Sequence, residues 1–452
     1  ASGDGNHGNN IFNGPLNVVC SGSGSLLLGV NMADQYNAPS VFTNTGTGNL
    51  YVAYGASGHV FNAPVTFNNN TASSNSAIYV SHGSTSTTFN ADITVNNTGQ
   101  GIFFCNGNNS AQAILSPGYR VLAGTDGFTA GALSLRQFYQ SGATPQNITL
   151  TSTATLRFGP SSTFDGNVTS VSPGILLNGA IFNGTTSFIK TGTSGDWSNG
   201  GNVFNGVCSI TNSGESYIVL GNNASDTWNE DVTFTANGAD RVLPAWRVSS
   251  WFNGNVYVNS NDTARGVQFC GGDTAARAYL AAGKTIREGS TGITSGYVYL
   301  RQFFQRGNTP VEITAVNNGS VYLGPNSDFE APVTITAPNI YVQGATYHAP
   351  ARFVKTGGGN NNNNSYQNIF ESTCEVEMQS NTGSFTLSQR SNDLFKDDII
   401  VNSSGTAAIS IGSSSYGSAP ELLAGKTIRV GAAGFSAGYL YLRHFTQQGS
   451  AP

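Results

Sequence analysis

The stretch that decides the fold runs from residue 61 to residue 67 and reads FNAPVTF. Its pattern recurs as FNADITV at residues 89–95 and as FEAPVTI at residues 329–335. Apolar residues stand at every second position, so we expect each stretch to form a β-strand that buries one face. The many Val, Ile, Thr and aromatic residues agree with this prediction, because these residue types favour strands.

Short second strands are expected after such stretches, because apolar runs followed by turn residues occur at residues 77–80, 102–105 and 267–270. No stretch reads as a helix. Two or three short strands joined by turns therefore form one repeating unit.

An aromatic residue, usually followed by Asn and then Gly or Ala, marks each unit. We interpret these aromatics as structural residues: Phe12, Tyr36, Phe61, Phe89, Phe164, Phe182, Phe204, Trp228, Phe252, Phe329, Tyr347, Phe370 and Phe395. Most neighbours in the series are 23 to 28 residues apart. The two long gaps, after Phe89 and after Phe252, each equal about three such units. The period indicates a solenoid.

The predicted fold class is all-β, a parallel β-helix (β-solenoid) with rungs of roughly 24 residues. The same aromatic keeps the same strand position over more than a dozen units, which favours parallel coiling with like residues stacked in register. Antiparallel sandwiches also use short strands at regular spacing. An array of Ig-like sandwiches is therefore the less favoured alternative.

A longer repeat is marked by a segment that occurs three times without gaps, at residues 118–145, 283–310 and 425–452. Each copy holds a Gly-x-x-Gly motif and then Leu-Arg-x-Phe-x-Gln-x-Gly-x-x-Pro. The predicted long repeats are residues 1–145, with four aromatic rungs before the segment, 146–310 and 311–452. They differ in length by whole rungs, which a solenoid accepts because each rung contacts only its neighbours. We expect one continuous solenoid cut from a longer array.

The arginines of the Leu-Arg segments are candidate packing or inter-chain residues: Arg136, Arg301 and Arg443. A period of two would place Leu135 on one strand face and Arg136 with Phe138 on the other. A strand with both faces occupied predicts that the Arg packs against another element or a neighbouring chain. Pairing with the Gln four residues later is favoured over ligand binding.

Composition excludes several classes of protein. Only 10% of the residues are charged and the net charge is -5, while 38% are hydrophobic, so the chain can bury apolar stripes and is not disordered. No basic cluster could neutralise phosphates, so a nucleic-acid partner is not expected. No apolar run approaches the ~20 residues that a membrane span needs. The five scattered cysteines lack metal-site spacing and read as small buried residues.

The densest acidic positions are Glu230, Asp231, Asp397 and Asp398. Cleavage of a glycosidic bond needs two carboxylates about 5–9.5 Å apart. These four residues lie at the edges of aromatic strands, where solvated surface carboxylates are ordinary. We therefore assign no catalytic or metal-binding residue, no cofactor and no enzymatic activity, with a calcium site as the alternative at these acids.

The aromatic rungs, the FIKTG and FVKTG stretches at residues 188–192 and 353–357, and the Leu-Arg segments together cover nearly all of the chain. They resemble the giant repetitive surface adhesins of gliding and predatory Bacteroidota, including the grappling-hook filaments that catch prey. The resemblance implies type IX secretion, an extracellular cell-surface location and self-association into a filament.

Our first hypothesis is a structural segment of an extracellular filament or adhesin that provides reach and stiffness for cell attachment or prey capture. The alternatives are a surface module that binds glycans of other cells, and a β-helical polysaccharide lyase or hydrolase. An exposed aromatic row without acids would favour glycan binding. Paired carboxylates in a groove would favour the enzyme, and burial of the Leu-Arg segments between chains would favour the filament.

Overall fold

The predicted parallel β-solenoid is confirmed. The computed structural model describes residues 4–83, 86–107, 109–261, 265–361, 366–413 and 415–449. These residues form strands and no helix, in parallel turns of roughly 24 residues. The chain divides into two compact units, residues 1–229 and 230–452, and both are built from the same kind of rung.

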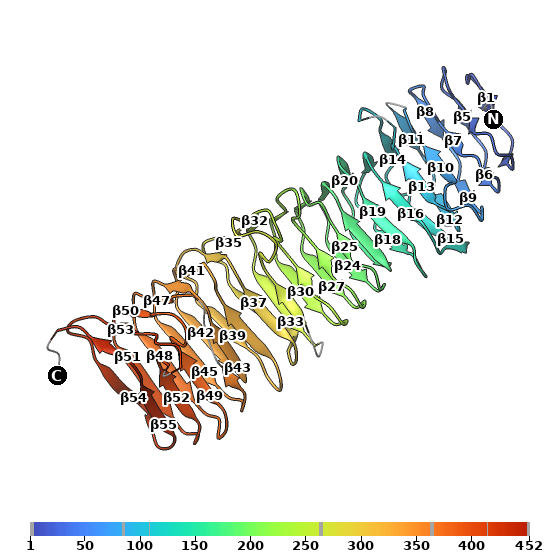
Figure 1. The fold of residues 1–452 in the computed structure, drawn as a ribbon. Helices are drawn as coiled ribbons and strands as arrows, with labels where there is room; N and C mark the ends of the chain where they lie inside the picture. Colours follow the sequence, from blue (N-terminus) through green and yellow to red (C-terminus); the bar gives the residue numbers. More distant parts are fainter. Residues whose placement is uncertain are drawn as a thin grey trace. The chain divides into compact units, whose positions relative to one another are not determined.

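Each rung consists of three short strands separated by corners. One rung of the first unit contains β8 (His59–Phe61), β9 (Val65–Asn69) and β10 (Ala77–Val80). The next contains β11 (Thr87–Phe89), β12 (Ile93–Asn97) and β13 (Gly101–Phe104). The strands pair in parallel with their equivalents one rung away, as β8, β9 and β10 do with β11, β12 and β13, so that sheets line three sides of each unit. Two of these sides are divided between successive sheets. We call the side that contains β10 and β13, and the equivalent side of the second unit, the third sheet. Figure 1 shows these equivalent strands side by side within each unit.

Register is the reason why like residues meet in the core. Phe61 lies opposite Phe89, and Val65 lies opposite Ile93. These side chains are buried while their strand neighbours are half-exposed, as a period of two requires. The core of each unit is therefore a set of parallel ladders of apolar side chains.

The expected single strand over residues 61–67 is wrong in one respect. β8 ends at Phe61 and β9 begins at Val65, so residues 62–64 form a corner. Pro64 has no N–H to give to a ladder, which favours a break in the strand at this point. The alternation of apolar and polar residues continues through the corner, because Phe61 before it and Val65 after it both point into the core.

The Leu-Arg segment was also expected to be one strand with two occupied faces, and this is wrong. β16 (Ala132–Leu135) ends at the Leu, and β17 (Phe138–Gln140) begins at the Phe. Gln137 turns the chain between them with a φ of 48°. Leu135 and Phe138 therefore both point into the core, and Arg136 lies at a corner.

The Gly-x-x-Gly motif forms a bulge in the longest strands of the chain, which are β15 (Val121–Phe128), β36 (Ile286–Ile293) and β54 (Ile428–Phe435). The register shifts within each of these strands, and each is the last strand of its sheet. Gly127 has a φ of +80°, and a Cβ at Gly124 would lie 2.3 Å from Asn96 Oδ1. The positive φ favours glycine at position 127, and a side chain at position 124 would have to displace that of Asn96.

Candidate functional site

The rung aromatics form face-to-face stacks in the core. In the first unit, the ring centroids from Phe12 to Phe89 lie 4.3–5.2 Å apart, and those from Phe164 to Trp228 lie 5.3–5.6 Å apart. In the second unit, the stack from Phe329 to Phe395 has spacings of 4.9–5.5 Å. All thirteen except the half-buried Phe12 are buried. These rings hold rungs together and are not open to a ligand.

Leu and Gln occupy the aromatic position where the series has its long gaps. Phe89 pairs in register with Leu115, Leu115 with Gln140, and Gln140 with Phe164. The buried Gln140 donates from Nε2 to the carbonyl oxygens of residues 141 and 142, at 2.9 and 2.8 Å. Its Oε1 accepts from the amide of residue 166. The glutamine thus closes a turn and joins two rungs.

Among the described residues, Arg136 does not pair with Gln140, and Arg301 does not pair with Gln305. Arg136 donates from Nη2 to Asn109 Oδ1, and the buried Nε atom of Arg301 has no hydrogen-bond partner among the described residues. Arg443 lies over the Tyr441 ring, 4.9 Å from its centroid. The predicted Arg–Gln pairing is wrong at Arg136 and Arg301, because the side chains of Gln140 and Gln305 are occupied by backbone groups. Gln447 donates to the backbone carbonyl of Lys426.

A ladder of amide side chains follows the aromatic stack along the corner in the first unit. Each corner residue comes directly after a rung aromatic. Asn37 donates to Asn13, Asn62 to Asn37 and Asn90 to Asn62, with Nδ2–Oδ1 distances of 2.8–2.9 Å. The same bond recurs further along at Asn205. We call this series the amide ladder.

The same corner carries ion pairs in the second unit. Arg306 contacts Glu330 at 2.7 Å. His348 contacts Glu371 at 2.7 Å, and Lys396 contacts the other oxygen of Glu371 at 2.8 Å. We call these five residues the ionic ladder, and their side chains are partly open to solvent.

The contacts of the ionic ladder shift the pKa values of its members. Partial burial acts to lower the pKa of His348, but hydrogen bonds to Glu371 and Asp328 outweigh it, so the pKa is raised. Hydrogen bonds from Lys396 and His348 lower the pKa of Glu371. The ladder therefore favours charged His348 beside charged Glu371.

The acidic residues singled out in the sequence bind groups of the next rung. Asp231 Oδ1 accepts from the Asn255 amide at 2.8 Å, and Asp398 Oδ1 accepts from the Thr427 amide at 2.9 Å. Asp397 pairs with Lys426 at 2.7 Å. Within the described residues, no three His, Cys, Asp or Glu side chains converge as a metal site would require. These contacts favour the structural interpretation of the acids.

The lysine of the FVKTG stretch is buried inside a corner. Lys355 Nζ donates to the carbonyl oxygens of Pro338 and Gly357, at 2.8 and 2.7 Å. Burial lowers the pKa of Lys355 to about 8. The ammonium group thus satisfies corner carbonyls of two rungs, which gives this motif a structural role.

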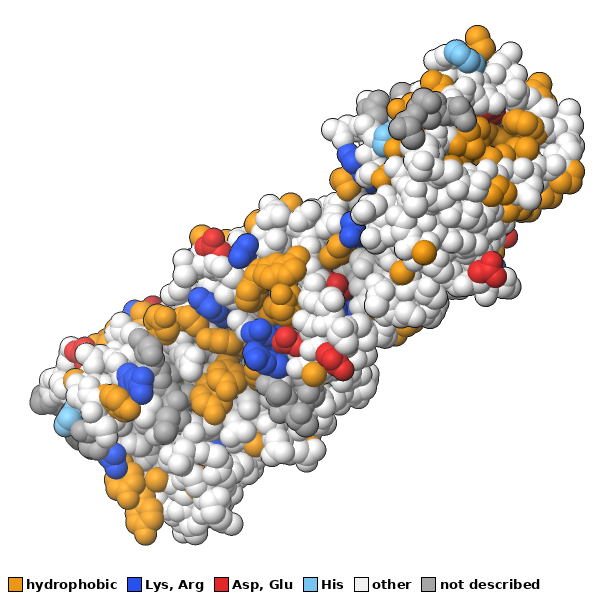
Figure 2. Space-filling view, turned by 45° about the vertical axis from the view of Figure 1, so that its right-hand side comes forward, with side chains coloured by type: hydrophobic (Ala, Val, Ile, Leu, Met, Phe, Trp, Pro, Cys, Tyr) orange, Lys and Arg blue, Asp and Glu red, His pale blue; other side chains and the backbone are white. Residues whose placement is uncertain are grey.

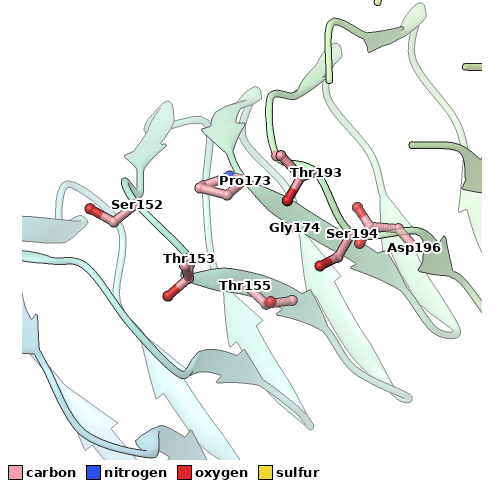
Figure 3. Close-up of a pocket in the computed structure, with 9 residues that line it drawn as sticks. Ser152, Thr153, Thr155, Pro173, Gly174, Thr193, Ser194 and Asp196 are labelled. Atoms are coloured by element: carbon pink, nitrogen blue, oxygen red, sulfur yellow. The ribbon is translucent and has the colours of Figure 1, made fainter. Parts of the chain in front are cut away.

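Two hollows lie on the outer face of the third sheet of the first unit. The larger, about 390 Å³, is lined by residues that include Tyr79, Phe103 and Arg157. The smaller, about 80 Å³, extends from Thr153 to Asp196 (Figure 3). Thr153 and Thr155 line both hollows, so the two adjoin. No Asp or Glu lines the larger one.

The remaining surface is mainly uncharged and polar, as Figure 2 shows for one face. An exception on the second unit is the outer row Trp251, Tyr279 and Phe304, in which the Trp and Tyr rings stack at 4.4 Å. Arg277 and Arg306 lie over the Phe304 ring. The rings of this row therefore pack against one another and against two arginine side chains of the same unit.

The described residues contain no helix with the length and hydropathy that a membrane crossing requires. No family model, curated protein or solved structure matches the chain.

Proposed function

We propose that the chain is a structural segment of an extracellular repetitive filament or adhesin, and that it supplies reach and stiffness for cell attachment or prey capture. The observation that carries the proposal is the continuous stacking of rung aromatics in each unit, from Phe164 to Trp228 and from Phe329 to Phe395. Stacked rings joined by parallel hydrogen-bond ladders resist bending and stretching at every rung. A surface of mainly uncharged polar groups suits a secreted protein.

Mechanical extension of the whole chain between two handles tests the proposal. We expect the chain to stay folded at low force and then to lengthen in steps, each releasing one rung of roughly 24 residues, or about 80 Å of extended chain. The variant Phe370→Ala should yield at lower force. Asn62→Ala removes two corner hydrogen bonds but no core ring, so it should yield closer to the wild-type force. Smooth lengthening at low force would contradict the proposed stiffness.

The filament part of the proposal includes self-association, which sedimentation at increasing concentration measures. We expect species larger than one chain to appear as concentration rises. A single monomeric species at all concentrations, together with cleavage of polysaccharides by the chain, would reject the filament in favour of an enzyme.

A further inference from the structure

A row of aromatic side chains lies on the outer face of the third sheet in the first unit. Tyr51 of β7 (Leu50–Val52) pairs in register with Tyr79, and Tyr79 pairs with Phe103. The rings stack with centroid distances of 4.9 and 5.4 Å. All three are half-buried. Each ring therefore covers one face of the next, as in the core stacks.

The row stops at Phe103. The residue in register on the next strand is Ser134, and the one after it is Arg157 of β19 (Thr155–Phe158). A serine cannot cover the second face of the Phe103 ring. The larger hollow lies beside this place, and its lining residues include Phe103, Arg157 and Ala132, which precedes Ser134 by two residues in β16.

Because Ser134 is small, the space beside the Phe103 ring can hold one further ring. Two rung steps separate Phe103 from Arg157, or about 9.6 Å at the usual strand spacing. That distance accommodates one ring layer between an aromatic face and a guanidinium group, each in van der Waals contact. The second unit fills the equivalent place with its own side chain, because Tyr299 stands where Ser134 stands beside the Leu-Arg pair. Tyr299, Tyr322 and Tyr341 follow one another in register there, without a gap.

The residues that line the larger hollow indicate which chemical groups a bound ring would carry. Arg157 is exposed and makes no hydrogen bond or ion pair with any described residue. Gln100, Asn106 and Thr155 line the same hollow and can bond hydroxyl groups. An aromatic wall, a few polar groups and one cation without a carboxylate suit a ring with an apolar face, several hydroxyls and a negative charge.

We infer that this slot binds the carboxylate-bearing sugar ring of an acidic glycan, stacked on Phe103 in the place of the missing side chain and paired with Arg157. The adjoining smaller hollow, in which Thr153 and Ser194 lie on either side of Gly174 (Figure 3), gives the neighbouring sugar a polar surface. This role goes beyond reach and stiffness, since it would give the segment a target to hold.

The test uses the whole chain and an aldobiouronic acid, which is one uronic acid linked to one neutral hexose, with cellobiose as the neutral comparison. Saturation-transfer NMR should show the uronic acid ring protons in contact with protein, and titration calorimetry should show tighter binding of the acidic disaccharide. Arg157→Gln, an exposed change, should weaken binding about tenfold through loss of a charge-assisted hydrogen bond. Ser134→Tyr, which copies Tyr299, should fill the slot and remove binding.

Thermal unfolding of each variant checks that it folds, and Tyr299 shows that the third sheet accepts a tyrosine at this place. No binding of the acidic disaccharide to the wild type would overturn the inference. Binding that survives Ser134→Tyr, or equal binding of cellobiose, would also overturn it. These outcomes leave the mechanical proposal untouched, because stretching does not depend on Ser134 or Arg157.

Discussion

The corner that follows the rung aromatics is held mainly by amide groups in the first unit, where Asn183 also donates to Asp165, and by the ion pairs that run from Arg306 to Lys396 in the second. In the amide ladder, Asn62 donates to Asn37 and accepts from Asn90. In the ionic ladder, Glu371 accepts from His348 on one side and from Lys396 on the other. The two arrangements occupy the same place in the rung.

The backbone at this corner is the same in both units. The amide of Asn62 donates to the carbonyl of Tyr36 at 2.8 Å, and the amide of Glu371 donates to that of Tyr347 at 2.9 Å. The ladder side chains are therefore not what specifies the fold. They instead contribute to the response of each unit's stability to salt and pH, because ionic contacts respond to both and amide contacts to neither.

The largest effect should come from the core stack, which the two units share. Phe204→Ala and Phe370→Ala each remove a fully buried ring, and we expect each to lower the unfolding free energy of its own unit by about 3–5 kcal/mol. Hydrogen exchange read by mass spectrometry measures the two units separately in one sample. Because rungs stabilise mainly their neighbours, the other unit should keep its protection.

Equal losses in the two units would show that the difference between them is confined to the corner. A loss below about 1 kcal/mol in either unit would mean that its aromatic stack is not what holds the rungs together. The difference between the two units would then include their cores as well as their corner ladders.

A smaller effect should separate the two ladders directly. Asn62→Ala removes two amide hydrogen bonds, and we expect a loss of about 1 kcal/mol that is the same at low and high salt. Glu371→Ala removes two partly exposed ionic contacts, and we expect about 0.5–1 kcal/mol at low salt. At 1 M salt most of the Glu371 effect should disappear, because the screening length falls to about 3 Å.

Chemical denaturation with urea, which adds no ions, measures both variants across the salt series. The matched control is Glu371→Gln, which keeps an acceptor but removes the charge. Because Glu371→Gln also lacks the charge, its difference from wild type should shrink at 1 M salt as that of Glu371→Ala does. A salt-dependent effect of Asn62→Ala would contradict the assignment of the amide ladder as uncharged.

The sequence predicted the rung and its aromatic, but not the corners. Phe61, Val65 and Phe67 point into the same core, so a period of two looks unbroken although a corner lies between Phe61 and Val65. The same confusion made Leu135 and Phe138 seem to lie on opposite faces. The spacing of hydrophobic residues predicts which side chains are buried, but it does not predict where the chain turns a corner.

The ionic ladder could have been found from the sequence by aligning the rungs on their aromatics. His348, Glu371 and Lys396 are 23 and 25 residues apart, and each follows a rung aromatic. Parallel register then places them side by side. The slot on the third sheet is harder to predict, because it depends on a serine where other rungs have rings, and its depth follows from packing around it.

The smallest effect is a pH dependence confined to the second unit. The folded pKa of His348 is raised above 6.5, so its contribution to stability is complete below pH 6.5 and is lost as the pH rises through the folded value. Glu371, with a pKa lowered from 4.5, contributes above pH 4.5 and loses its contribution as the pH falls through its folded value. The His348–Glu371 contact should therefore stabilise the second unit most between pH 4.5 and 6.5.

His348→Asn, which copies the first unit, should remove this dependence. Since both side chains are more than a third exposed, solvent screening limits the expected difference from wild type to about 0.5 kcal/mol at pH 5.5, falling toward zero at pH 8.5. Subtracting the wild-type curve cancels other titrations, such as that of buried Asp393, whose pKa burial raises to about 6. A difference that grows with pH would reverse the sign and reject the charged His348–Glu371 pair. A difference that stays constant would mean that histidine acts there through packing, in which case the two ladders differ in response to salt alone.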